Sequence, residues 1–123
     1  MTFTILVIDD EDLTRKLLYH CLTRAGYEVI EAENGVEALT KLETIQPDCI
    51  ISDVLMPGMN GFETLQHIRE IPKLASTPVI FLSSRADTDA EYRGLETGAQ
   101  KYLFKPFNVS GLLETVEMLL PVC

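Results

Sequence analysis

Acidic side chains follow two short apolar stretches of the sequence. Asp9 and Asp10 come directly after residues 2–8, and Asp53 comes shortly after residues 49–51. Each carboxylate, taken singly, could simply cap a following helix, because its oxygen accepts hydrogen bonds from free backbone amides. If the two stretches are neighbouring strands, however, three carboxylates converge, and their mutual repulsion requires a proton or a cation. Carboxylate oxygens with no His or Cys nearby select a hard ion such as Mg²⁺.

Hydroxyl and lysine side chains follow two later apolar stretches. Ser83 and Ser84 come after residues 78–82, and Lys105 comes after residues 102–104. A serine pair in this place is commonly part of a turn, and a surface lysine ion pair contributes only about 0–1 kcal/mol. Combined with the acids, Lys105 has a further meaning, because one lysine and one divalent cation together neutralise three carboxylates. A site with that balance can hold an anionic phosphoryl group.

Asp53 is the predicted nucleophile of this site. A carboxylate can attack phosphorus and form an acyl phosphate, while a bound metal ion shields the approach of one anion to another. Asp53 stands alone before the turn-forming residues 56–61, whereas Asp9 and Asp10 stand together as a metal-holding pair. The two histidines fall inside predicted helices, so no Ser-His-Asp arrangement is visible, and the nucleotide-binding motifs GxxxxGK[ST] and GxGxxG are absent from the sequence.

Apolar stretches and helical patterns alternate along the whole chain. Strands are predicted at residues 2–8, 27–32, 49–51, 78–82 and 102–104, and helices at 11–25, 36–42, 62–68, 86–95 and 112–119. Strands that are apolar throughout, each followed by an amphipathic helix, indicate a parallel sheet covered by helices on both faces. Right-handed crossovers then favour a doubly wound α/β fold. Ligands bind such sheets beyond the carboxyl ends of the strands, which is where the acids, the serines and the lysine lie.

Local signals mark the ends of several helices. Gly26 follows the first helix as a terminating residue. Asn34 with Glu37 is close to a capping box, and Asn108 can cap the last helix. The apolar residues that recur at helical spacing in the first helix are Leu13, Leu17, Leu18, Cys21, Leu22 and Ala25.

The composition limits the classes of protein to which this chain can belong. Its 123 residues fit one domain, and 46% of them are hydrophobic, as a packed core requires. Ten Lys and Arg stand against 19 Asp and Glu, a net charge of −9 that argues against direct nucleic-acid binding. Three widely spaced cysteines favour neither a zinc site nor a disulfide framework, and Cys21 and Cys49 are expected to be buried thiols. The sequence contains no signal peptide or long apolar stretch, so a cytoplasmic location without membrane contact is expected.

Four motifs occur in order along the chain: VIDDE at residues 7–11, DVLMPGMNG at 53–61, FLSS at 81–84 and GAQKYLFKPF at 98–107. Together they resemble the receiver domain of two-component response regulators, over essentially all of residues 1–123. The resemblance implies a flavodoxin-like α/β fold, with a five-stranded parallel sheet in the order 2-1-3-4-5 and five helices.

The resemblance assigns a role to each residue of the site. Asp53 is the phospho-acceptor, and Lys105 contacts the phosphoryl group and precedes a cis peptide bond to Pro106. The ligands of Mg²⁺, for which Mn²⁺ can substitute, are Asp10, Asp53 and the backbone carbonyl of Leu55, with Asp9 acting through a bound water.

The same resemblance implies a conformational switch. Ser83 matches the switch hydroxyl, and Tyr102 matches the aromatic residue whose rotamer follows phosphorylation. Ser84 departs from the Ala or Gly that the family more often has. Leu55 and Arg85 occupy the two positions that tune the lifetime of the phosphoryl group, and their combination leaves that lifetime open.

The implied partners are a sensor histidine kinase or a histidine phosphotransfer protein as donor, and a downstream protein target or an output domain as receiver of the signal. The signalling surface comprises the fourth helix, fifth strand and fifth helix, residues 86–119. A phosphorylation-dependent dimer is a further expected form. The chain is not expected to be an enzyme, since it would catalyse only its own phosphorylation and dephosphorylation.

Two other functions fit parts of the pattern. A small Mg²⁺-dependent phosphatase with an aspartate nucleophile is one, although such enzymes carry Asp-x-Asp after the first strand and this chain has adjacent acids there. A structural or flavin-binding domain of the same fold is the other. The chain is either a stand-alone regulator or a receiver cut from a longer protein, and Met1 directly before the first strand favours a genuine N-terminus.

Overall fold

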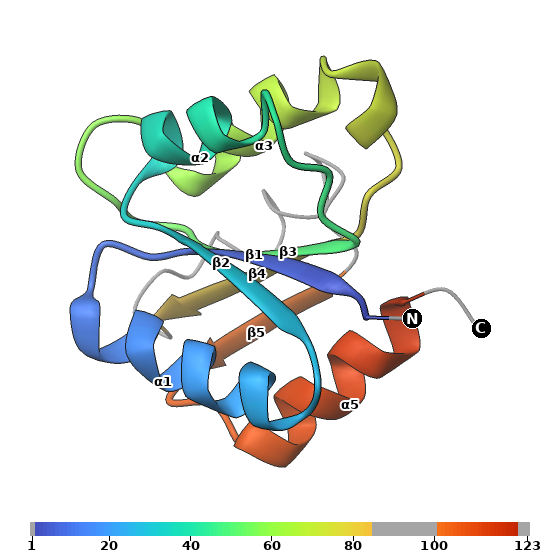
Figure 1. The fold of residues 1–123 in the computed structure, drawn as a ribbon. Coiled ribbons are helices and arrows are strands. Elements are labelled where there is room, and N and C mark those ends of the chain that lie inside the picture. Colours follow the sequence, from blue (N-terminus) through green and yellow to red (C-terminus); the bar gives the residue numbers. More distant parts are fainter. Residues whose placement is uncertain (1, 85–100, 121–123) are drawn as a thin grey trace.

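One parallel sheet organises the molecule. The computed structural model describes residues 2–84 and 101–120, and its five strands are hydrogen-bonded in the order β2-β1-β3-β4-β5 (Figure 1). The strands are β1 (Thr4–Ile8), β2 (Glu28–Ala32), β3 (Cys49–Asp53), β4 (Val79–Ser84) and β5 (Lys101–Lys105). The helices are α1 (Asp12–Arg24), α2 (Gly35–Lys41), α3 (Gly61–Arg69) and α5 (Val109–Leu119), with a 3₁₀ turn η1 (Pro72–Leu74). The predicted doubly wound α/β fold and its strand order are confirmed.

The described ranges contain four α-helices. The helix predicted at residues 86–95 lies outside them.

Helices cover both faces of the sheet. Figure 1 shows α2 and α3 on one side and α1 and α5 on the other. Alternate residues of β1 therefore enter different cores: Leu6 and Ile8 belong to one buried cluster, and Ile5 and Val7 belong to the other. Burial on both sides explains why the central strands read as continuous apolar runs.

Asparagine side chains begin three of the helices. Asn34 accepts a hydrogen bond from the Glu37 amide at the start of α2, and Asn108 accepts one from the Gly111 amide at the start of α5. At α3 the capping box is complete, because the Asn60 side chain accepts a hydrogen bond from the Glu63 amide and the Glu63 carboxylate accepts one from the Asn60 amide. That capping box is not among the sequence predictions.

The apolar face of α1 differs from the sequence prediction. Leu13 is 82% exposed and Leu17 is 47% exposed, whereas Leu18 and Leu22 are buried. Positions 15, 18 and 22 lie on one side of a helix, so the inward face of α1 carries Arg15, which is buried. Leu13 and Leu17, two positions before and after Arg15, lie on the other side of the helix and remain in contact with solvent.

The cysteine predictions are half confirmed. Cys49 is buried in β3, but Cys21 is only partly buried on α1. Cys123 lies outside the described residues.

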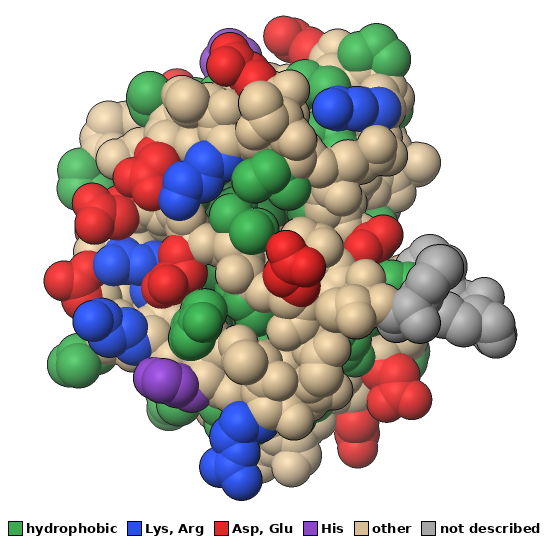
Figure 2. Space-filling model, viewed as in Figure 1, with side chains coloured by type: hydrophobic (Ala, Val, Ile, Leu, Met, Phe, Trp, Pro, Cys, Tyr) green, Lys and Arg blue, Asp and Glu red, His purple; other side chains and the backbone are tan. Residues whose placement is uncertain are grey.

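Charged side chains are spread over the surface. Figure 2 shows acidic and basic groups interspersed over the face of the molecule in view. His20 and His67 are both exposed on helices. Among the described residues, no helix combines the length and apolar character that crossing a membrane would need.

Candidate functional site

The carboxyl ends of two neighbouring strands, β1 and β3, bring the predicted acids together. Ile8 of β1 pairs with Ser52 of β3, so Asp9 and Asp53 emerge side by side at one edge of the sheet. Carboxylate oxygens of Asp9, Asp10 and Asp53 lie within 4.8 Å of one another. Asp9 and Asp53 are buried and Asp10 is exposed, so the cluster opens to solvent on the side of Asp10.

Lys105 reaches the same cluster from β5. Its Nζ lies 3.3 Å from Oδ2 of Asp9 and 3.4 Å from Oδ2 of Asp53. The pairing of Ser84 with Lys105 places this lysine at the end of the sheet that carries the acids. The peptide bond between Lys105 and Pro106 is cis, as the family resemblance implies.

Backbone amides fix one oxygen of each buried carboxylate. The Glu11 amide donates to Oδ1 of Asp9 at 2.9 Å, and the Val54 amide donates to Oδ1 of Asp53 at 2.8 Å. The other oxygen of each residue faces Lys105. Both carboxylates are therefore held in one orientation, with their free oxygens directed toward the cluster.

The buried carboxylates are short of positive charge. Burial, followed by repulsion from Asp9, raises the pKa of Asp53 from 3.8 to about 6, although Lys105 works in the opposite direction. Burial also raises the pKa of Asp9, against the lowering effects of the Glu11 amide and Lys105. For Lys105, burial alone would lower the pKa, but the charges of Asp53 and Asp9 outweigh it and the pKa is raised. Lysine therefore stays charged and leaves the acids only partly compensated.

The donor set of this cluster fits a hard divalent cation. All three groups offer carboxylate oxygen, the ligand type that Mg²⁺, Mn²⁺ and Ca²⁺ prefer. A cation there would relieve the repulsion between Asp9 and Asp53 that Lys105 leaves. The cluster could thus hold a metal ion.

The raised pKa of Asp53 predicts a pH-dependent gain in stability from Asp53→Asn. A carboxyl whose pKa is higher in the native state destabilises that state once it ionises, so the penalty grows between pH 3.8 and about 6 and is constant above. With EDTA present at pH 8, we expect the unfolding free energy of D53N, measured by urea denaturation, to exceed that of the wild type by roughly 2–3 kcal/mol. The gain should vanish near pH 3.5. A difference independent of pH would contradict this cause.

A close approach of backbones supports the segment after Asp53. The Gly61 amide donates to the Val54 carbonyl at 2.8 Å. A Cβ on Gly61 would lie 2.3 Å from the carbonyl oxygen of Asp53. The first residue of α3 must therefore be glycine if the chain is to return so near to Asp53.

Gly61→Ala should consequently destabilise the protein. We expect a loss of roughly 1–3 kcal/mol in unfolding free energy, the usual cost of overpacking, measured by urea denaturation. Gly111→Ala is the matched control, because a Cβ there meets only Asn108 at ordinary distances of 3.8 and 4.0 Å. G111A should be neutral or stabilising by up to about 1 kcal/mol. Equal effects of the two substitutions would contradict the role of the close approach.

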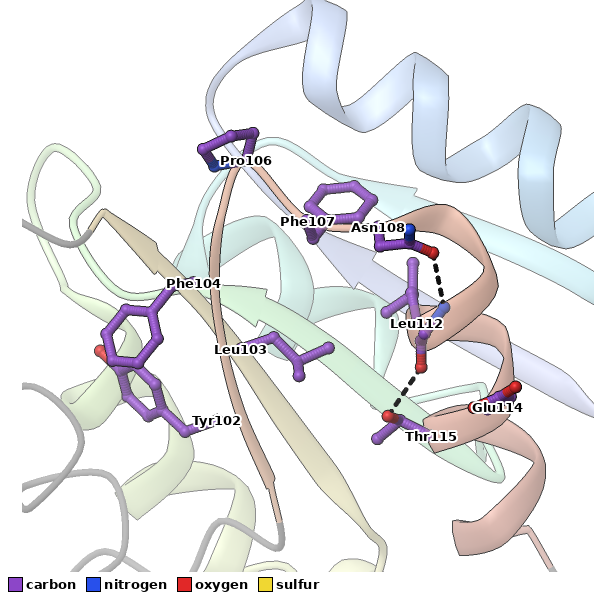
Figure 3. A pocket seen from close by; sticks show the side chains of 10 residues that line it. Tyr102, Leu103, Phe104, Pro106, Phe107, Asn108, Leu112, Glu114 and Thr115 are labelled. Atoms are coloured by element: carbon purple, nitrogen blue, oxygen red, sulfur yellow. Dashed lines mark hydrogen bonds between the residues drawn. The ribbon is translucent and has the colours of Figure 1, made fainter.

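The two predicted switch residues lie on neighbouring strands, at different distances from the carboxyl ends of those strands. Ser83 is buried in β4 opposite Phe104, one position beyond the partner of Asp53. Tyr102 is partly buried further back on β5, with its ring 6.1 Å from Phe81 and 5.3 Å from Phe104 between centroids. Figure 3 shows Tyr102 and Phe104 on one side of β5 and Leu103 on the other, toward α5.

The remaining predicted positions are Leu55, Ser84 and Arg85. Leu55 follows the acidic edge with its side chain 60% exposed. Ser84 ends β4. Arg85 lies outside the described residues.

Arg15 is a site residue that the sequence prediction missed. It is buried, and its Nη1 donates to the backbone carbonyl of Asp9 at 2.8 Å. An arginine on the same helix face as Leu18 and Leu22 was the available signal, because a charged residue on an inward face requires buried partners.

Comparison with known proteins agrees with this geometry. The profile described as "Response regulator receiver domain" matches residues 5–117. The transcriptional regulatory protein YrkP of Bacillus subtilis (strain 168), described as uncharacterized, is 43% identical over 108 residues, 88% of this chain and 45% of YrkP. The alkaline phosphatase synthesis transcriptional regulatory protein PhoP of the same strain is 40% identical over 108 residues, 88% of this chain and 44% of PhoP.

Solved structures extend the match to the whole fold. The chemotaxis response regulator CheY4 of Vibrio cholerae has a TM-score of 0.91 and 38% identity, covering 98% of this chain and 100% of CheY4. The chain spans about half the length of the curated relatives it matches. With its parallel sheet, its acidic cluster and these matches, the chain belongs to the receiver domain family of two-component response regulators, whose signalling role is that of a phospho-acceptor.

Proposed function

We propose that Asp53 accepts a phosphoryl group from a phosphohistidine donor in a Mg²⁺-dependent step. The observation that carries this proposal is the shared edge of the sheet. There a carboxylate oxygen of Asp53 lies within 4.8 Å of carboxylate oxygens of Asp9 and Asp10, and Oδ2 of Asp53 lies 3.4 Å from Nζ of Lys105. Asp53 combines a buried, oriented carboxylate with a free oxygen that faces the only lysine of the cluster among the described residues.

The acidic cluster would hold the metal ion. Asp10, Asp53 and the backbone carbonyl of Leu55 would bind Mg²⁺ or Mn²⁺ directly, and Asp9 would act through a bound water. When bound, the ion supplies positive charge that lets an anionic phosphoryl group approach an anionic nucleophile.

The transfer itself needs few protein groups. An Oδ of Asp53 attacks phosphorus and forms the new P–O bond, while the P–N bond to the donor imidazole breaks and its electron pair stays on the nitrogen. The imidazole leaves in its neutral form if its other ring nitrogen carries a proton, and otherwise takes a proton from solvent. Lys105 stays charged throughout, as its raised pKa requires, and contacts the phosphoryl oxygens.

The added charge would then switch the surface. Ser83 lies one position beyond the partner of Asp53, so its hydroxyl can turn toward the phosphoryl oxygens. Tyr102 would move into the space that Ser83 leaves, and the change would spread over residues 86–119, of which 86–100 lie outside the described ranges. A local charge event would in this way bias a two-state surface.

A protein donor is supported by the surface beside the site. A cavity of about 380 Å³ is lined by both Leu17 and Lys105, and Leu13 is exposed on the same helix. Exposed apolar groups next to a phospho-acceptor fit a docked protein better than a small donor alone. We therefore propose a sensor histidine kinase or histidine phosphotransfer protein as donor.

The receiver of the signal is proposed by analogy with the relatives. Several of them are named transcriptional regulators and are about twice as long as this chain. We propose that residues 1–123 act as one cytoplasmic receiver domain that controls a protein target or an output domain, with phosphorylation-dependent dimerisation as one form. Direct contact with nucleic acid or membrane is not part of this role.

The experiment that tests the function separates a receiver from a phosphatase. With acetyl phosphate and Mg²⁺, we expect at most one phosphoryl group per chain, because Asp53 is the one proposed nucleophile. With p-nitrophenyl phosphate we expect no sustained release of nitrophenol. Multiple turnover there would favour the aspartate-nucleophile phosphatase, and the absence of any adduct would overturn both.

A further inference from the structure

Arg15 connects the acidic site to a second group of acids on β2 and α1. Its side chain is only 9% exposed, although arginine is rarely buried unless it is paired. Nη2 lies 2.6 Å from Oδ1 of Asp12, and Nε lies 3.3 Å from Oε1 of Glu31. Glu33 stands further away, with 3.9 Å between Oε1 and Nη2. Three carboxylates outside the cluster thus surround one guanidinium.

The remaining nitrogen of Arg15 contacts the acidic site. Nη1 donates to the backbone carbonyl of Asp9, the residue whose carboxylate faces Lys105. The backbone amide of Glu11 also contacts Asp9, because it donates a hydrogen bond to Oδ1 of the Asp9 carboxylate. The turn that carries Asp9 and Asp10 is therefore held at the Asp9 carbonyl by Arg15 and at the Asp9 carboxylate by the Glu11 amide.

We propose that Arg15 is a positioning residue for the cation site: its guanidinium fork, anchored by Asp12 and Glu31, fixes the Asp9–Asp10 turn. This inference rests on the proposed function, because it concerns the same metal ion. A fork with several fixed donors can make these contacts at once, and a lysine ammonium cannot.

Positioning and simple charge predict opposite effects on Mg²⁺ binding. Removing a positive charge near an acidic site strengthens the attraction for a cation. Removing a group that orients a metal ligand weakens binding, commonly by about 10–100-fold. Arg15→Met keeps the apolar stem of the side chain and removes the fork, so the sign of its effect decides between the two causes.

Lys41→Met is the matched control. Lys41 also carries one positive charge beside β2, where its Nζ donates to the backbone carbonyl of Glu31 and pairs with Glu37 at 3.1 Å. Lys41 and Arg15 line the same surface cavity. The contacts of Lys41 are with Glu31 and Glu37 and, unlike those of Arg15, include no residue of the Asp9–Asp10 turn.

The test is a Mg²⁺ titration followed by NMR at the Val54 and Glu11 amides, which donate to Asp53 and Asp9. We expect R15M to raise the Mg²⁺ dissociation constant about tenfold or more. We expect K41M to leave this constant unchanged or to lower it. Arg15→Lys, which retains the charge and guards against a folding defect in R15M, should also bind Mg²⁺ more weakly than the wild type.

Each other outcome decides against a specific statement. R15M binding as tightly as K41M, or R15K binding like the wild type, would overturn the positioning role while leaving the proposed function intact. A wild-type protein whose amides show no saturable response to Mg²⁺ would overturn the proposed function itself, and the inference with it.

Discussion

Asp53→Asn protein incubated with acetyl phosphate and Mg²⁺ is expected to carry no phosphoryl adduct. The amide keeps the shape of the side chain and an oxygen that accepts from the Val54 amide, but it lacks the anionic oxygen that attacks phosphorus. Intact-protein mass spectrometry measures the result directly. The expected effect is complete loss, the largest that any single substitution in this site should produce.

Asp48→Asn provides the matched control for that experiment. Asp48 lies just before the other end of β3, where its carboxylate accepts from the Thr4 amide at 2.8 Å. The substitution removes the same charge, 5 positions from Asp53 on the same segment, and should leave the adduct unchanged. An adduct that persists in D53N, or disappears equally in D48N, would contradict the assignment of Asp53.

Lys105→Met is expected to have opposite effects on the two ligands of the site. Without the ammonium, no basic side chain among the described residues lies within 4 Å of the Asp9 and Asp53 carboxylates. We therefore expect Mg²⁺ to bind at least several-fold more tightly. Phosphorylation by acetyl phosphate should slow by about 10²–10³-fold, because a donor directed at the transferring group is lost.

Lys101→Met is the control for this second experiment. Lys101 begins β5 and is exposed, at the opposite end of the strand from Lys105. It carries the same charge, so its removal tests whether net charge alone changes either quantity. Weaker Mg²⁺ binding in K105M, or an unchanged rate of phosphorylation, would contradict the place given to Lys105.

The fold could be predicted because each element has a local cause. The apolar runs ending at Ile8 and near Asp53 are buried on both faces, and that burial determines both their composition and their place at the centre of the sheet. Gly26 adopts a φ of 100°, which agrees with its predicted place after the first helix. The acids and Lys105 could be placed at one edge for the same reason, since parallel strands end together.

Other features of the site depend on contacts that no local pattern contains. Helical spacing alone could not identify the inward side of α1, because Leu13 and Leu17 fit a helical period as Leu18 and Leu22 do, yet only Leu18 and Leu22 are buried. Only the neighbouring β2, which supplies Glu31, makes burial of Arg15 favourable. The requirement for Gly61 likewise follows from the return of α3 to the Asp53 carbonyl, a distance in space and not in sequence.

The central claim is that Asp53 itself carries the phosphoryl group, and chemical reduction tests it most directly. Borohydride reduces an aspartyl phosphate to homoserine, and peptide mass spectrometry then locates the reduced residue. After treatment with acetyl phosphate and Mg²⁺, the expected result is homoserine at position 53 alone. Homoserine at position 9 or 10, or a phosphate on Ser83 that survives reduction, would contradict it.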